Sequence, residues 1–222
     1  MPKLGLSIKP QLIIFDCDGV LVDSEPLTNV VLARMISDAG WPMDGHECGA
    51  QLDGRTIKSV IQVVEQKIKR QLPDDWEDIY EQQIYALLAD EVKVVAGVFE
   101  VIEHLENQKI PMCVASSGPM EKMLITLGRT GLWEKFHPNI FSATMVRNGK
   151  PSPELFLYAA DKMGMSPENC LVIEDTPVGA QAARAAKMPC IGYAGGVFGH
   201  EQGLIDSGAV IIKNLHDLLE IL

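Results

Sequence analysis

Short, continuously apolar runs recur along this chain of 222 residues, and helical patterns separate them. A run without polar alternation is typical of a strand buried on both faces, as in a parallel sheet covered by helices. The expected strands are Gln11–Phe15, Met112–Ala115, Ile140–Ala143, Cys170–Ile173, Cys190–Tyr193 and, at a sheet edge, Val210–Ile212. The expected helices between them are Gly97–Gln108, Pro119–Leu127, Ser152–Met163 and Pro177–Ala186. This alternation predicts an α/β fold with a doubly wound, Rossmann-like parallel sheet.

Residues 26–91 depart from this alternation. They contain helical patterns over Val30–Ala39, Thr56–Ile68 and Trp76–Leu88, and no convincing strand. Glycine and proline interrupt these patterns, as is typical of turns between helices. We therefore expect a small α-helical cap domain over residues 26–91, inserted into a core domain formed by residues 1–25 and 92–222.

The composition excludes several classes of function. A net charge of −11, without a run of Lys or Arg, disfavours binding to nucleic acid. The spacing of the five cysteines fits neither a disulfide framework nor a zinc site. Residues 1–10 lack the apolar stretch of a signal peptide, and no apolar run is long enough to span a bilayer. We expect a cytoplasmic protein with no nucleic-acid or membrane partner.

Polar residues stand where the apolar runs end. They are Asp16 and Asp18, Ser116 with Ser117, Lys150, and Glu174 with Asp175. In an open parallel sheet, ligands bind beyond the carboxyl ends of the strands. These separate segments therefore predict a single site at one edge of the sheet.

Most of these residues also have a structural explanation. Asp16 could cap a loop, with Asp18 in an Asp-Gly turn. Ser116 could cap the helix expected at Pro119, and Asp175 the helix expected at Pro177. Lys150 could be a solvated lysine after the Asn-Gly turn signal that precedes it.

Four segments, in order, resemble the motifs of the haloacid dehalogenase superfamily. They are Asp16-Cys17-Asp18-Gly19-Val20-Leu21-Val22-Asp23-Ser24, Val114-Ala115-Ser116, Gly149-Lys150-Pro151 and Glu174-Asp175-Thr176-Pro177-Val178-Gly179. The resemblance covers essentially the whole chain. The insertion after the first motif is similar to that of members with a helical cap, near the β-phosphoglucomutase and sugar-phosphatase branch.

The resemblance implies roles for the first two aspartates of the first motif and for Lys150. Asp16 would attack phosphorus and form an aspartyl phosphate. Asp18 would protonate the leaving alcohol and then activate the water that hydrolyses the intermediate. Lys150 would steady Asp16 and the phosphoryl group.

The resemblance also implies a Mg²⁺ cofactor and a phosphate site. Carboxylates and a phosphate dianion cannot share a pocket without added positive charge. The expected metal ligands are Asp16, Asp18 through its backbone carbonyl, Glu174 and Asp175. The expected substrate or phosphate contacts are Ser116, Ser117, Lys150 and, in the cap, Gly54 and Arg55.

The expected activity is hydrolysis of a small phosphate monoester, such as a sugar phosphate or the sugar-acid phosphate 6-phosphogluconate, by a monomer. The dehalogenases and phosphonate hydrolases of the superfamily lack the second aspartate. A mutase of the β-phosphoglucomutase type stays as an alternative. Three departures from the mutase pattern favour hydrolysis: Thr28 stands where mutases usually have a histidine, Ile57 stands where they have a cap arginine, and Gln71–Glu91 contains no Lys or Arg. A catalytically silent binding protein is an alternative of another class, which predicts loss of motif residues that are present here.

Overall fold

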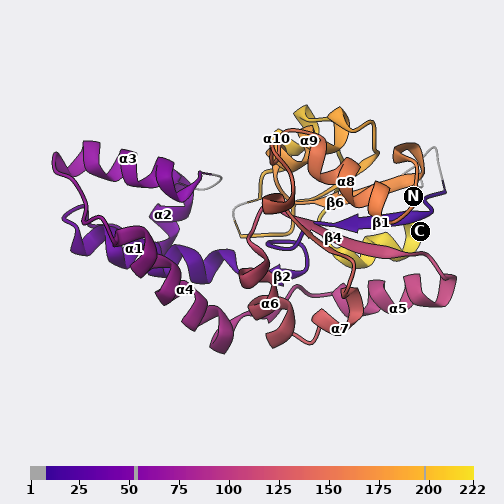
Figure 1. The fold of residues 1–222 in the computed structure, drawn as a ribbon, viewed down its shortest axis with the longest axis horizontal. Helices are drawn as coiled ribbons and strands as arrows, with labels where there is room; N and C mark the ends of the chain where they lie inside the picture. Colours follow the sequence, from indigo (N-terminus) through magenta and orange to yellow (C-terminus); the bar gives the residue numbers. More distant parts are fainter. Residues whose placement is uncertain (1–8, 53–54, 198) are drawn as a thin grey trace. The chain divides into compact units, whose positions relative to one another are not determined.

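The computed structural model describes residues 9–52, 55–197 and 199–222, which divide into two compact units (Figure 1). The core unit comprises Met1–Asp23 and Lys93–Leu222, and the helical unit comprises Ser24–Val92. The sequence argument places the corresponding boundaries at residues 26 and 91.

The core unit contains a sheet of six parallel strands. They are β1 (Leu12–Phe15), β4 (Met112–Ser116), β5 (Ile140–Ser142), β6 (Cys170–Glu174), β7 (Cys190–Tyr193) and β8 (Val210–Ile212). Their order in the sheet is β5-β4-β1-β6-β7-β8. The predicted α/β class with a parallel sheet is confirmed, and the edge position expected for the last strand is observed.

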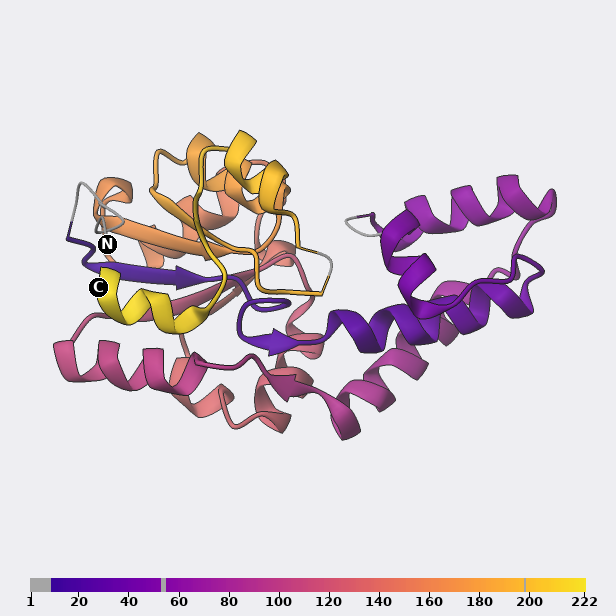
Figure 2. The ribbon, with the colours of Figure 1, turned by 180° about the vertical axis from the view of Figure 1, so that it is seen from behind.

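Helices cover both faces of this sheet (Figures 1 and 2). One face carries α5 (Val98–Gln108), α6 (Met120–Arg129), α7 (Trp133–Phe136) and α11 (Leu218–Ile221), and the other carries α8 (Glu154–Lys162), α9 (Pro177–Ala185) and α10 (Glu201–Asp206). Short 3₁₀ turns occur at Ala143–Met145, Pro167–Asn169 and Leu215–Asp217. Helix α5 shows why such helices form here, because its buried residues Val98, Val101, Ile102 and Leu105 follow the spacing of a single helix face.

The central strand β1 fixes the position of the site. Its four residues are fully buried, and each burial of a Leu, Ile or Phe side chain contributes about 2 kcal/mol. Phe15 lies in register with Val114 of β4 and Ile173 of β6. The residues that follow these three strands therefore emerge side by side at the same sheet edge.

A two-stranded antiparallel sheet lies where the chain leaves the core unit and returns to it. Its strands are β2 (Val22–Asp23) and β3 (Lys93–Val94), and Asp23 pairs with Lys93. The sequence analysis misses both strands, because two residues carry no detectable period.

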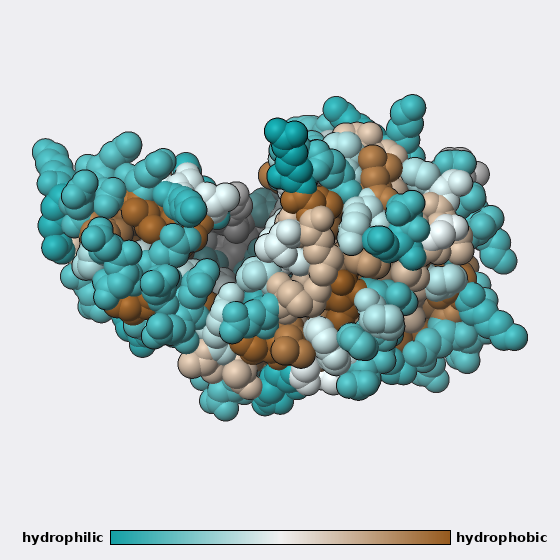
Figure 3. All heavy atoms as spheres, viewed as in Figure 1, coloured by the Kyte–Doolittle hydropathy of each residue, from teal (hydrophilic) through white to brown (hydrophobic). Residues whose placement is uncertain are grey.

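The helical unit consists of α1 (Glu25–Asp38), α2 (Gly45–Leu52), α3 (Ile57–Ile68) and α4 (Trp76–Glu91). Three of these helices correspond to predicted helical patterns, and α2 does not. Among the residues described, no helix combines the length and apolar content that a bilayer crossing requires. The face drawn in Figure 3 is mainly hydrophilic, with apolar side chains in separate patches, as expected from the charge composition.

Candidate active site

Three buried charged side chains form an ion-pair cluster beyond the carboxyl end of β1. The Nζ atom of Lys150 donates to Asp16 Oδ1 at 2.5 Å and to Glu174 Oε1 at 2.6 Å. The side chains of Lys150, Asp16 and Glu174 are only 3%, 10% and 1% exposed. This burial excludes the alternative that Lys150 is a solvated turn residue.

The cluster shifts the titration of its members. The pKa of Asp16 is raised to about 7, because burial, reinforced by Glu174, outweighs the lowering effect of Lys150. Burial lowers the pKa of Lys150, but the carboxylates of Asp16 and Glu174 outweigh this effect, and the net pKa lies above its ordinary value. A carboxylate with so little hydration attracts any further cation that can reach it.

Glu174 uses both of its carboxylate oxygens within the protein. Oε1 accepts from Lys150, and Oε2 accepts from the backbone N–H groups of Asp175 and Thr176 at 3.1 and 3.0 Å and from the Thr176 hydroxyl at 2.9 Å. A Cβ atom at Gly179 would overlap this carboxylate. Glu174 therefore connects Lys150 to the start of α9. Its expected role as a metal ligand stays a prediction.

Asp18 lies beside the loop that follows β4. Its Oδ1 atom accepts from Lys122 Nζ at 2.8 Å. Ser116 is buried, and its hydroxyl accepts from the Gly118 N–H at 3.0 Å, while the Ser142 hydroxyl donates to the Gly118 carbonyl at 2.8 Å. The sequence analysis missed Lys122, which lies 104 positions from Asp18 and carries no motif signal.

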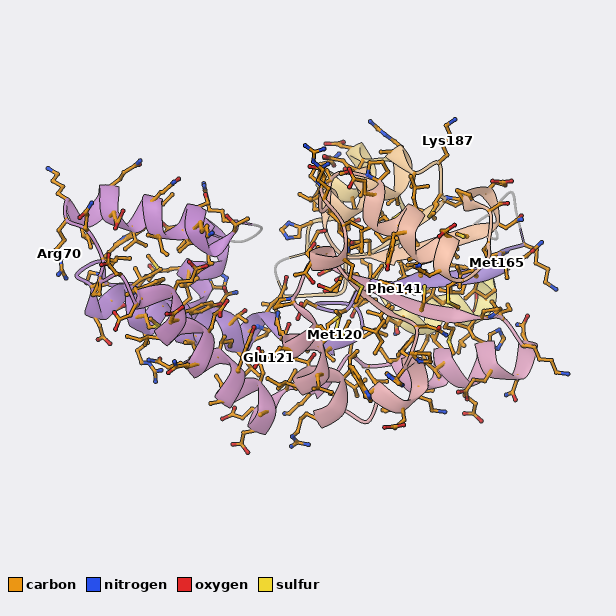
Figure 4. All side chains as sticks on the ribbon, viewed as in Figure 1. Arg70, Met120, Glu121, Phe141, Met165 and Lys187 are labelled. Atoms are coloured by element: carbon orange, nitrogen blue, oxygen red, sulfur yellow. The ribbon has the colours of Figure 1, made fainter. Side chains whose placement is uncertain are left out.

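The start of α6 excludes one structural explanation of the serines. The N-cap residue of α6 is Pro119, which provides no side-chain cap, and Ser117 is exposed. Ser116 therefore does not cap this helix, and its hydroxyl braces the loop instead. Figure 4 labels Met120 and Glu121 at the start of α6, directly before Lys122.

Asp175 packs against the turn that follows Asp16. A Cβ atom at Gly19, whose φ is +79°, would overlap the Asp175 carboxylate. Only a glycine tolerates both this φ and this close approach. Thr176, not Asp175, is the N-cap of α9, because its hydroxyl accepts from the Gly179 N–H at 3.1 Å. The capping explanation of Asp175 is therefore wrong.

The two cap residues expected to contact the substrate, Gly54 and Arg55, belong to the helical unit and not to the core unit that carries the cluster. Gly54 lies outside the described residues. Arg55 is an exposed residue of the helical unit, and its N–H donates to the Leu52 carbonyl at 3.3 Å. Their contact with a substrate stays a prediction.

The donor set of the core cluster fits Mg²⁺. No group of three or more His, Cys, Asp or Glu side chains within the described ranges is arranged to hold a metal. Mg²⁺ does not need one, because it commonly binds through one or two carboxylates together with water and phosphate oxygens. Asp175 supplies one carboxylate, against the turn at Gly19, and Asp16, three residues before this turn, supplies another.

Comparison with known proteins gives consistent matches. A family model described as haloacid dehalogenase-like hydrolase matches residues 10–187. The 6-phosphogluconate phosphatase of Escherichia coli (strain K12) is 29% identical over 179 residues, which cover 80% of each chain. A phosphorylated carbohydrates phosphatase of Thermotoga maritima is 27% identical over 214 residues, covering 96% of this chain and 98% of the relative.

A solved structure shows that the similarity extends to the fold. A conserved haloacid dehalogenase-like protein from Agrobacterium tumefaciens str. C58 has a TM-score of 0.85 and 35% identity, covering 95% of this chain and 96% of the other. The family match spans most of the chain and includes all four motif segments. The chain therefore belongs to the haloacid dehalogenase-like hydrolase family, and it is a phosphoric monoester hydrolase.

Proposed function

We propose that the protein is a Mg²⁺-dependent phosphatase that hydrolyses a sugar phosphate or a sugar-acid phosphate such as 6-phosphogluconate. The observation that carries this proposal is the buried cluster of Lys150, Asp16 and Glu174 beyond β1. A buried lysine at 2.5 Å from Asp16 holds this carboxylate in place and balances its charge. The names of the relatives from E. coli and T. maritima support the substrate class.

Asp16 and Asp18 carry the two steps of the reaction. In the first step, a carboxylate oxygen of Asp16 bonds to phosphorus, the bond from phosphorus to the alcohol oxygen breaks, and Asp18 gives that oxygen a proton. In the second step, Asp18 takes a proton from water as the water oxygen attacks phosphorus. Inorganic phosphate leaves, and the Asp16 carboxylate is restored.

The metal would be held by Asp16, Asp175 and the backbone carbonyl of Asp18. When bound, Mg²⁺ offsets the negative charge that Asp16 and the phosphate bring together. Glu174 also holds Lys150, because its Oε1 atom accepts from Lys150 Nζ. We keep Glu174 among the expected metal ligands.

The remaining groups bind and select the substrate. Ser116 is the last residue of β4 and Ser117 follows it, and their hydroxyl or N–H groups would bind the phosphate oxygens. The helical unit would act as a cap that admits the ester, with Gly54 and Arg55 as contacts. We also propose a cytoplasmic monomer, and the five cysteines support a reducing compartment, since each is a buried free thiol.

Phosphate release from p-nitrophenyl phosphate and from a panel of sugar phosphates tests this function. We expect release in the presence of Mg²⁺, no release with a chelator, and none from an Asp16→Asn variant. Asp161→Asn is the matched control, because Asp161 is an exposed residue of α8. If the folded protein with Mg²⁺ releases phosphate from no ester, the proposal is wrong. Isomerisation of glucose 1-phosphate primed by a bisphosphate would then be measured, followed by ligand binding without turnover.

A further inference from the structure

The ion pair between Lys122 and Asp18 is not part of any motif described above. Lys122 lies in the first turn of α6, and its Nζ atom is 2.8 Å from Asp18 Oδ1. The two side chains are 19% and 25% exposed, so the pair lies at the accessible edge of the site. Asp18 is the residue to which the proposed function assigns proton transfer.

The stability of α6 does not explain a lysine at this position. The first turn of a helix carries a partial positive charge, which disfavours a cation there. The residues three and four places after Lys122 are Ile125 and Thr126, so α6 offers no acidic partner at these spacings. The ion pair with Asp18 compensates for this placement.

The backbone that carries Lys122 is fixed to the sheet. The Gly118 N–H donates to the Ser116 hydroxyl, and the Gly118 carbonyl accepts from the Ser142 hydroxyl. Ser116 and Ser142 are buried ends of β4 and β5. Lys122 therefore holds Asp18 from a rigid support, which is what precise positioning of a side chain requires.

The pair also distinguishes the two oxygens of Asp18. Oδ1 is held by Lys122, whereas Oδ2 faces the loop after β4. An ideal Cβ atom on Gly118 would lie 3.6 Å from Asp18 Oδ2 and 3.4 Å from Ser116 Oγ. Oδ2 and the Ser116 hydroxyl thus border the same small space above the Cα atom of Gly118.

We propose that Lys122 is a positioning residue that fixes the carboxyl group of Asp18, so that Oδ2 is the atom that exchanges the proton. Oδ2 gives its proton to the alcohol oxygen as the bond from this oxygen to phosphorus breaks, and it takes a proton from the water that attacks the aspartyl phosphate. This inference rests on the proposed function.

The dependence on the leaving group tests the inference. The measurement is kcat/KM of Lys122→Met with the best sugar phosphate and with p-nitrophenyl phosphate, because kcat/KM reports the steps up to departure of the leaving group. An alkoxide needs a proton to leave, whereas p-nitrophenolate does not. We expect a loss of about tenfold or more with the sugar phosphate. With p-nitrophenyl phosphate, we expect a loss of less than about threefold, since orientation of the acid contributes little there.

Two further variants complete the experiment. Lys122→Arg keeps a cation beside Oδ1 and should recover part of the loss with the sugar phosphate. Lys135→Met is the matched control, because Lys135 pairs with Glu106 at 2.9 Å on the surface and should leave both substrates unaffected. If Lys122→Met does not fold, Lys122→Gln replaces it in the same comparison.

Two results would overturn the inference. Equal losses with both substrates would mean that Lys122 does not act through proton transfer to the leaving group. A rise in KM for both substrates with unchanged kcat would mean that Lys122 binds the phosphate directly. A wild-type protein without turnover would instead contradict the proposed function, so the two failures are distinguishable.

Discussion

Lys150 balances the charge of the buried cluster that it forms with Asp16 and Glu174. Its cation is the partner of two buried carboxylates, those of Asp16 and Glu174. Lys150→Met would leave both of them without this cation, and breaking a buried pair in this way costs about 3–5 kcal/mol. We expect the free energy of unfolding, measured by urea denaturation, to fall by about this amount. We also expect phosphate release to disappear.

A double variant separates the loss of charge balance from general damage to packing. Lys150→Met combined with Glu174→Gln removes one carboxylate along with the lysine, so it should be more stable than Lys150→Met alone and still inactive. Lys135→Met is the surface control and should cost about 1 kcal/mol or less. Similar losses of stability at Lys135 and Lys150 would contradict the argument.

The sequence identifies the side chains of the motifs, but it does not show which hydrogen bonds they form with one another. The sequence places Asp16, Lys150 and Asp175 at one sheet edge, because Asp16 and Asp175 directly follow strands and Lys150 lies within a recognisable motif. Glu174 shows the limit, since only coordinates reveal that its oxygens accept from Lys150 and from the start of α9. Lys122 shows the same limit, because a contact across 104 positions leaves no local pattern.

At the level of elements, two glycines in helices should respond to alanine in opposite directions. Gly179 lies in α9, where a Cβ atom would overlap the Glu174 carboxylate, whereas Gly128 in α6 has open space around this position. Alanine normally stabilises a helix interior by about 0.5–1 kcal/mol. We expect Gly128→Ala to gain about this much in free energy of unfolding, and Gly179→Ala to lose about 1–3 kcal/mol through overpacking.

Chemical denaturation of the two variants checks this expectation, and Gly128→Ala serves as the matched control for helix propensity. The Glu174 carboxylate cannot move aside easily, because Lys150 and the N–H groups at the start of α9 hold it. If Gly179→Ala is as stable as Gly128→Ala, the close packing of α9 on Glu174 is wrong.

The strands of the sheet were easier to predict than the remaining elements. Each sheet strand is mainly a short apolar run, and this pattern is visible in the sequence. Strands β2 and β3 contain two residues each, which is too short for an apolar and polar alternation to be detected. Helix α1 begins at Glu25, five residues before the predicted start at Val30, because its first turn is mostly polar and offers no apolar repeat.

For the molecule as a whole, binding of Mg²⁺ should raise the free energy of unfolding. A metal that binds only the native protein raises its free energy of unfolding by about 2.7 kcal/mol when its concentration is a hundredfold above the dissociation constant. We expect Mg²⁺ to raise the melting temperature of the wild type and not that of Asp175→Asn. Asp161→Asn is the control and should respond as the wild type does. An equal rise in both variants would show that the ion acts on the surface and not at Asp175.

The division into two units leads to the last prediction, which concerns the core unit alone. Asp23 and Lys93 are paired in the two-stranded antiparallel sheet, so the ends left by removal of Ser24–Val92 lie opposite each other in register. An Asn-Gly pair is the preferred two-residue connection for such strands, because both positions tolerate a positive φ. We therefore expect the core with Asn-Gly in place of Ser24–Val92 to fold cooperatively.

This shortened protein should also show whether catalysis and discrimination between substrates depend on different units. Asp16, Asp18, Lys150 and Asp175 all belong to the core unit, so slow, Mg²⁺-dependent hydrolysis of p-nitrophenyl phosphate should persist. Discrimination among sugar phosphates should fall, because Gly54 and Arg55 are removed with the helical unit. Circular dichroism, urea denaturation and kcat/KM over the substrate panel measure these outcomes. If the folded core keeps the full substrate preference of the intact chain, the helical unit does not select the substrate, and its assignment as a cap is wrong.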